Sequence, residues 1–120
     1  MKALFDTNIL IDYLIGLEVA ATELEQHVDA QISIITKMEV LVGASKNEEE
    51  EVRAFLDHFT VINLNEKIAE IAITIKREHK IKLPDAIIWA TAKYTNSLLI
   101  TRNTKDFPTH APDIKVPYSI

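Results

Sequence analysis

The chain has no cysteine among its 120 residues, and this absence removes two kinds of site. Neither a disulfide nor a metal centre with thiolate ligands can form, which fits a protein of a reducing compartment. The chain also begins without a long apolar run, because Asp6 follows only the three apolar residues 3–5. Such a start is neither a secretion signal nor a membrane span, so we expect a cytoplasmic protein with no membrane partner.

Glycine is nearly absent as well, with only Gly16 and Gly43 in the whole chain. A dinucleotide-binding fingerprint needs three glycines and a phosphate-binding P-loop needs two at fixed spacing, because the backbone must approach phosphate closely. Neither motif can be built from this sequence. The four histidines also have no neighbours that would form a catalytic triad or a zinc motif.

The rest of the composition is that of an ordinary globular protein, with 48% apolar and 26% charged residues. A chain of this length can bury a real core, so we expect one domain over residues 1–120. The net charge of −5 argues against a general nucleic-acid coat, which would be basic. It does not argue against a nuclease, because acids that bind a metal count as negative until the metal is present.

Short apolar segments that predict strands alternate with segments that predict helices. We expect strands at residues 3–5, 30–35, 60–64, 97–101 and 114–116. We expect helices around the apolar stripes of 10–17, 52–59 and 68–75, at 19 to about 28, at 37–45, and from Pro84 onward. This alternation requires crossover connections, so it predicts a three-layer α/β/α fold with a mainly parallel central sheet. Ligands of such folds bind outside the carboxyl ends of the strands.

Three carboxylates, Asp6, Glu39 and Asp85, each lie at the edge of a predicted strand or helix. The fold would gather them at the carboxyl ends of the strands, and a gathered set of acids needs a cation to neutralise it. Hard divalent cations such as Mg²⁺ prefer oxygen ligands of this kind. The pattern therefore points to metal-assisted hydrolysis of a phosphodiester.

Each acid also has a purely structural interpretation. Asp6 could cap the helix that follows it, and Asp85 could be favoured by the helix dipole just after Pro84. Thr36 and Glu39 have the spacing of a capping box, in which each side chain accepts a backbone hydrogen bond from the other residue. Metal binding and capping need not exclude each other.

A last polar segment, residues 99–107, follows a predicted strand directly and should lie at the same edge as Asp6. It contains Thr101, Asn103 and Asp106, and the last of these could equally belong to a surface turn ahead of Pro108.

Taken together, residues 6–8, 36–39, 83–92 and 99–107 resemble the PIN-domain ribonucleases, and within them the VapC-type toxins of toxin–antitoxin pairs. The resemblance covers nearly the whole chain, with four motifs in the right order at suitable spacing. It implies an endoribonuclease with RNA as substrate, an antitoxin protein as partner and a homodimer.

The resemblance also implies roles for individual residues. It implies that Asp6, Glu39 and Asp85 hold Mg²⁺ or Mn²⁺. By the same resemblance, the residues whose hydrogen bonds are expected to orient the metal ligands are Thr7, Asn8, Thr101 and Asn103. Many relatives carry an acid at the position of Asn103, whose amide brings no charge, and Asp106 is the candidate catalytic acid to replace it. Whether one or two metals bind is left open.

Two other functions remain open from the sequence. One is a non-catalytic PIN-like binding or regulatory subunit. The other is a phosphatase with Asp6 as nucleophile, although Asn8 stands where such a motif would place its second acid.

Overall fold

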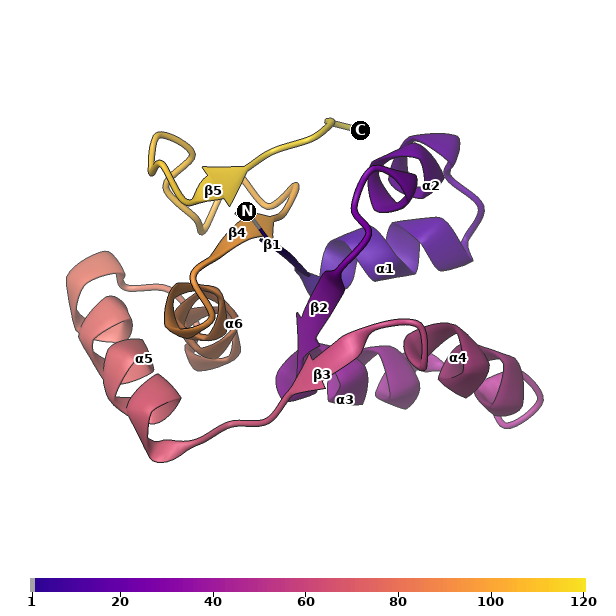
Figure 1. The fold of residues 1–120 in the computed structure, drawn as a ribbon, viewed down its shortest axis with the longest axis horizontal. Coiled ribbons are helices and arrows are strands. Elements are labelled where there is room, and N and C mark those ends of the chain that lie inside the picture. Colours follow the sequence, from indigo (N-terminus) through magenta and orange to yellow (C-terminus); the bar gives the residue numbers. More distant parts are fainter. Residues whose placement is uncertain (1) are drawn as a thin grey trace.

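Five strands form one sheet in the spatial order β3-β2-β1-β4-β5, and every neighbouring pair is parallel (Figure 1). The strands of this computed structural model, which describes residues 2–120, are β1 (Lys2–Phe5), β2 (Ala30–Ser33), β3 (Thr60–Ile62), β4 (Ser97–Ile100) and β5 (Ile114–Lys115). The predicted α/β class with a parallel sheet is confirmed. Because β1 is the central strand, the residue that follows it lies in the middle of the sheet edge.

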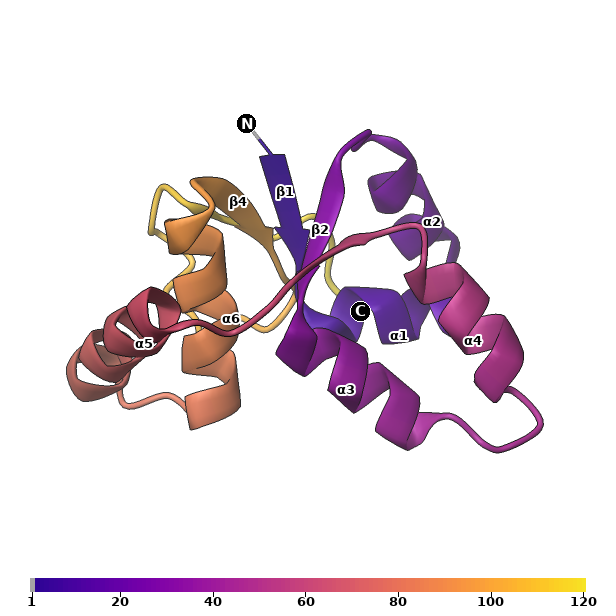
Figure 2. The same ribbon diagram turned by 60° about the horizontal axis from the view of Figure 1, so that its bottom comes forward.

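Six helices in the described residues 2–120 cover the two faces of the sheet. They are α1 (Thr7–Leu14), α2 (Glu18–Glu25), α3 (Ile34–Gly43), α4 (Glu49–Leu56), α5 (Glu66–His79) and α6 (Leu83–Tyr94). Figures 1 and 2 show α5 and α6 on one side of the strands and the first four helices on the other. The three-layer arrangement expected from the sequence is therefore present.

The core is divided in two by the sheet, because successive side chains of a strand point to opposite faces. In β1, Leu4 belongs to the core beneath α5 and α6, whereas Ala3 and Phe5 belong to the other core. In β4, Leu99 and Ile100 divide in the same way. Each fully buried leucine, isoleucine or phenylalanine contributes about 1.5–3 kcal/mol. The two cores together fix which residues come to the carboxyl edge of the sheet.

Helix α6 is the most buried helix, as its apolar sequence predicts. Its buried residues are Ala86, Ile88, Trp89, Ala90, Thr91 and Ala92. Pro84 lies in its first turn, where a missing backbone N–H costs nothing. The buried face fixes the rotation of the helix and, with it, the position of Asp85 in the first turn.

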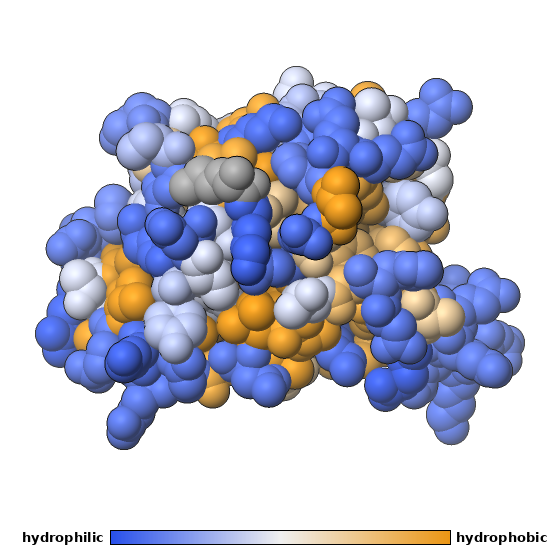
Figure 3. Space-filling model, viewed as in Figure 1, coloured by the Kyte–Doolittle hydropathy of each residue, from blue (hydrophilic) through white to orange (hydrophobic). Residues whose placement is uncertain are grey.

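The outer surface is mostly polar in the view of Figure 3, with an apolar area near the middle of that face. On helix α3, Met38 and Val42 are exposed. Among residues 2–120, no helix combines the length and the apolar character needed to cross a bilayer.

One prediction about the local structure is wrong. Strand β2 ends at Ser33, two residues earlier than expected, and helix α3 begins at Ile34 rather than near Lys37. The Ser33 hydroxyl accepts a hydrogen bond from the Ile35 N–H at 3.0 Å and so caps the helix. Thr36 lies inside the helix and is fully buried, so it cannot form a capping box with Glu39. The other predicted elements are present, with ends that differ by a few residues.

Replacing the Ser33 cap should destabilise the protein. We expect Ser33→Ala to lower the free energy of unfolding by about 1 kcal/mol, because the Ile35 N–H loses its acceptor. Urea denaturation followed by circular dichroism measures this change. Ser119→Ala, at an exposed serine near the C-terminus, is the control and should leave the stability unchanged. Equal stability of the two variants would contradict the assignment of Ser33 as the cap.

Candidate functional site

Asp6 follows the central strand directly and is held by three donors. One carboxylate oxygen, Oδ1, accepts the Thr7 N–H at 2.8 Å and thereby caps helix α1. The other, Oδ2, accepts the Thr101 hydroxyl at 2.7 Å and the Asn8 side-chain amide at 3.1 Å. The residue is only 3% exposed. Capping is therefore real, but it uses only one of the four lone-pair positions of the carboxylate, and Oδ1 keeps a free one.

Asp6 remains costly to ionise in spite of these bonds. Burial raises its pKa, the hydrogen bonds from Thr101 and Thr7 lower it, and the nearby charges of Asp85 and Glu39 raise it again. The balance raises the pKa from 3.8 to about 6. The influence of two acids from helices α3 and α6 means that they lie near Asp6, although each is distant in the sequence.

Asp85 is the second acid of this cluster and is half-buried. Its pKa is raised by burial first, then by the charges of Asp106 and Glu39, and Lys82 offsets part of this effect. The charges of Asp106, in segment 99–107, and of Glu39, in α3, thus both act on Asp85. Charge interactions therefore link all four acids predicted from the sequence, which come from segments near the carboxyl ends of the strands.

Glu39 lies on the exposed face of α3. Its Oε1 atom accepts the Thr7 hydroxyl at 2.6 Å. That hydroxyl also lies 3.1 Å from the hydroxyl of Thr36. Thr7 therefore connects two acids, since its backbone N–H binds Asp6 and its side chain binds Glu39.

The segment after β4 is organised by the side chain of Asn103. Its amide nitrogen donates to Asp106 Oδ2 at 3.0 Å, and its amide oxygen accepts the backbone N–H groups of Asp106 and Lys105, each at 3.2 Å. The Asn103 N–H in turn donates to the Thr101 hydroxyl at 3.0 Å. Asn103 therefore orients Asp106, and Asp106 is the member of the pair whose charge reaches Asp85.

The donor set of this cluster suits a hard divalent cation, because all of its charged ligands are carboxylate oxygens. Within residues 2–120, no three acidic or histidine side chains stand close enough to bind one ion together. Mg²⁺ usually takes one or two carboxylates directly and keeps several waters, so two of these acids would suffice. The raised pKa values of Asp6 and Asp85 mean that a bound cation would relieve repulsion.

One group of side chains next to the cluster was not predicted from the sequence. Arg102, the residue after Thr101, forms two hydrogen bonds with the buried carboxylate of Asp12, and the Tyr118 hydroxyl donates to the same carboxylate. The only sequence signal is that Asn8 and Asp12 are four residues apart and therefore share a helix face.

The chain belongs to the PIN-domain family, whose family model matches residues 3–111. Ribonuclease VapC1 of Methanocaldococcus jannaschii is 34% identical over 112 residues, which cover 88% of this chain and 79% of that protein.

Solved structures resemble the chain over almost its full length. A toxin–antitoxin complex from Klebsiella pneumoniae contains a chain that is 49% identical, with a TM-score of 0.94 and coverage of 99% of this chain and 100% of that one. VapBC2 from Rickettsia felis, bound to a DNA fragment from its promoter, is 23% identical, with a TM-score of 0.79 and coverage of 96% and 98%. The latter likeness concerns the fold alone.

The raised pKa of Asp6 predicts a pH dependence of stability in metal-free buffer. The folded protein binds the Asp6 proton more tightly than the unfolded chain does, so raising the pH disfavours the folded state. We expect the free energy of unfolding to fall between about pH 4 and pH 7, by at most about 3 kcal/mol from Asp6. Urea denaturation in EDTA across this range measures the slope.

Asp6→Asn should reduce this slope, leaving the smaller contribution of Asp85, whose pKa is shifted in the same direction. Asp57→Asn, at an exposed acid just after α4, should keep the wild-type slope. A slope that is identical in wild type and Asp6→Asn would show that Asp6 ionises as easily in the folded protein as in the unfolded chain.

Proposed function

We propose that this protein is a metal-dependent endoribonuclease and the toxin of a toxin–antitoxin pair, acting in the cytoplasm as a single PIN domain over residues 1–120. The observation that carries the proposal is the linkage of four acids from separate segments. Hydrogen bonds connect Asp6 to Glu39 through Thr7 and to Asp106 through Thr101 and Asn103. The charges of Asp106 and Glu39 act on Asp85. Membership of the PIN-domain family and the 34% identity to a ribonuclease support it.

In this proposal Asp6 and Asp85 are the direct ligands of Mg²⁺ or Mn²⁺, and Glu39, predicted as a ligand from the sequence, adds negative charge beside the ion. Bound there, the cation would activate a water for attack on phosphorus and neutralise charge on the phosphate and the leaving oxygen. The chain's own contribution is to hold the ligands in place. Thr101 and Asn8 fix the Asp6 carboxylate, and Thr7 fixes Glu39 relative to it.

Asp106 is the proposed fourth acid, and Asn103 is its positioning residue. The charge of Asp106 raises the pKa of Asp85, whereas the Asn103 amide is committed to hydrogen bonds within its own loop. An acid three residues later thus supplies the charge that Asn103 lacks. A second cation would bind in this proposal if Asp85 and Asp106 hold one together, and otherwise the site would bind a single cation.

The proposed partners are an RNA substrate, an antitoxin protein and a second copy of the chain. The 49% identity to a chain of a toxin–antitoxin complex supports the antitoxin. An antitoxin that inserts a basic side chain among the four acids would replace the cation and so inhibit cleavage.

The phosphatase alternative has little support from the geometry. Asp6 Oδ2 already accepts two hydrogen bonds and the residue is 3% exposed, which makes it a poor nucleophile. A non-catalytic binding subunit is the stronger alternative. A ribonuclease needs the acids for RNA cleavage, whereas a binding subunit would cleave no RNA with or without them.

Purified protein should cleave single-stranded RNA with Mg²⁺ or Mn²⁺ and stop in EDTA. Asp85→Asn should lower the cleavage rate by more than about 100-fold, which exceeds the usual loss from outer-shell partners. Glu39→Gln should lower it by at least about tenfold, or about 1.4 kcal/mol of transition-state stabilisation. A gel assay with end-labelled RNA measures each rate, and circular dichroism checks folding.

Asp57→Asn removes an acid far from the cluster and should cut at the wild-type rate. The inactive Asp85→Asn preparation also controls for contaminating ribonucleases, since these would copurify with either variant. Wild-type rates in Asp85→Asn would mean that the acids are misassigned. A wild-type protein that cuts no RNA with either cation would favour the binding subunit.

A further inference from the structure

Helix α1 holds residue 102 at two points. The Asn8 side-chain oxygen accepts the Arg102 backbone N–H at 3.4 Å. One turn further along, the Asp12 carboxylate accepts both Nε, at 2.5 Å, and Nη2, at 3.0 Å, of the Arg102 guanidinium. A two-point bond of this kind fixes direction as well as distance, which a single lysine contact would not do.

In the Asp12–Arg102 pair the carboxylate is buried, and Tyr118 also binds it. Asp12 is 1% exposed, and its Oδ2 atom also accepts the Tyr118 hydroxyl at 2.8 Å. Burial by itself would raise the pKa of Asp12, but the hydrogen bonds and the positive charge of Arg102 keep it below its ordinary value. Asp12 is therefore ionised and fully paired, and losing either donor would leave a buried carboxylate short of partners.

These contacts continue without a break to Asp6. Arg102 follows Thr101 in the chain, and Thr101 donates to Asp6 Oδ2. Asn8, which binds the Arg102 backbone, donates to the same oxygen. Both donors that fix Asp6 Oδ2 therefore adjoin residue 102, Asn8 through a hydrogen bond and Thr101 through the chain.

We propose that Asp12, Arg102 and Tyr118 form a positioning unit that sets the orientation of the Asp6 carboxylate for metal binding. The inference rests on the proposed metal site, and its kinetic consequence rests on the proposed ribonuclease activity. Within residues 2–120, none of the three side chains forms a hydrogen bond with an acid of the cluster, and their hydrogen-bonded route to Asp6 runs through Thr101 and Asn8.

The unit makes the C-terminal segment part of the site. Tyr118 lies beyond residues 3–111, which the PIN-domain family model matches. Its hydroxyl is the contact by which the segment after β5 reaches α1, and so it can influence Asp6 from outside the four motifs.

Two variants of the full chain test the unit, Tyr118→Phe and Asp12→Asn. Tyr118→Phe removes one hydroxyl and keeps the ring, so the protein should still fold. The first measurement is the Mn²⁺ concentration at half of the maximal rise in melting temperature, which needs no catalysis. We expect this midpoint to rise several-fold in Tyr118→Phe and about 10- to 100-fold in Asp12→Asn, the range for partners of metal ligands.

The second measurement is the split between kcat and KM on single-stranded RNA at saturating Mn²⁺. We expect kcat to fall in both variants while KM stays near the wild-type value, because the unit acts on a ligand of the metal and not on RNA. A purely structural role would lower the melting temperature and leave the Mn²⁺ midpoint and kcat where they are.

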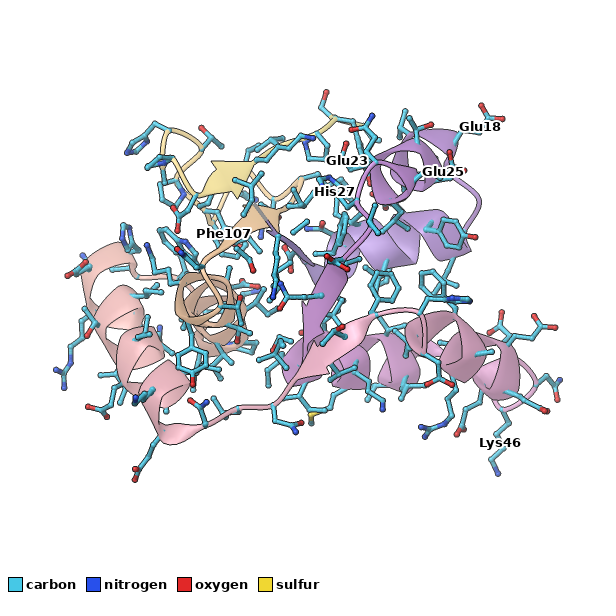
Figure 4. The ribbon with its side chains drawn as sticks, in the orientation of Figure 1. Glu18, Glu23, Glu25, His27, Lys46 and Phe107 are labelled. Carbon is cyan, nitrogen blue, oxygen red and sulfur yellow. The ribbon has the colours of Figure 1, made fainter. Side chains whose placement is uncertain are left out.

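The chain offers a matched control in another buried acid. Glu23 of α2 is labelled in Figure 4 together with His27, which follows the helix. Its Oε2 atom accepts a hydrogen bond from Lys115 Nζ at 2.7 Å and lies 3.0 Å from His27 Nε2. Like Asp12 it ties a helix to the C-terminal part of the chain, but within residues 2–120 neither Glu23 nor the side chains that it binds form a hydrogen bond with Asn8 or Arg102. Its link to Thr101 is the backbone hydrogen bond from the Thr101 N–H to the Lys115 carbonyl at 3.0 Å, which Glu23→Gln keeps. Glu23→Gln should lower the melting temperature without moving the Mn²⁺ midpoint.

Midpoints in Tyr118→Phe and Asp12→Asn that move no further than in Glu23→Gln would overturn the inference, as would a wild type whose melting temperature ignores Mn²⁺. If Asp12→Asn does not fold, Tyr118→Phe decides. A wild type that binds Mn²⁺ but cuts no RNA would defeat the proposed function alone, and the midpoints would still test the unit.

Discussion

The site depends on one buried carboxylate, that of Asp6, at the end of the central strand. Its two oxygens join three parts of the molecule: the start of α1 through the Thr7 N–H, the side chain of Asn8, and the end of β4 through the Thr101 hydroxyl. The Asp6 N–H also donates to Ile100 at 2.9 Å, so backbone and side chain bind the same neighbouring strand. The carboxylate thus connects α1 to the end of β4 and is, in our proposal, a metal ligand. These hydrogen bonds hold the segments that carry the other acids beside Asp6.

Ionising the carboxyl groups of this arrangement costs free energy. Burial and neighbouring acids raise the pKa of Asp6 to about 6 and raise that of Asp85, whereas the paired acids Asp12 and Asp113 have lowered pKa values. Acids with cationic partners stabilise the fold, and ionised acids in the cluster destabilise it, a cost that a bound cation would offset in our proposal. Perturbation of this kind is typical of functional sites, where stability is given up for binding. The surrounding hydrogen bonds keep the cost tolerable, since every buried side-chain polar atom among residues 2–120 has a partner.

Much of the fold could be predicted from the sequence because strand and helix periods are local. The segment 97–101 alternates across two cores, and the apolar start of α6 needs burial on all sides, so both were predicted correctly. The start of α3 was not, because Ile34 and Ile35 suit a strand by propensity and only the Ser33 hydroxyl makes them the first turn of a helix. The acids could be selected by their place at strand and helix edges, but the Asp12–Arg102 pair could not, because its members are 90 residues apart. The choice between Asn103 and Asp106 depended on a loop whose hydrogen bonds have no sequence pattern.

The central claim is that the acid cluster binds a divalent cation. It is tested most directly by anomalous scattering from crystals of the full chain grown with Mn²⁺. The account predicts a manganese peak within ligand distance of the carboxylates of Asp6 and Asp85, with waters completing the shell. A peak at another place on the protein, with none among these acids, would contradict it.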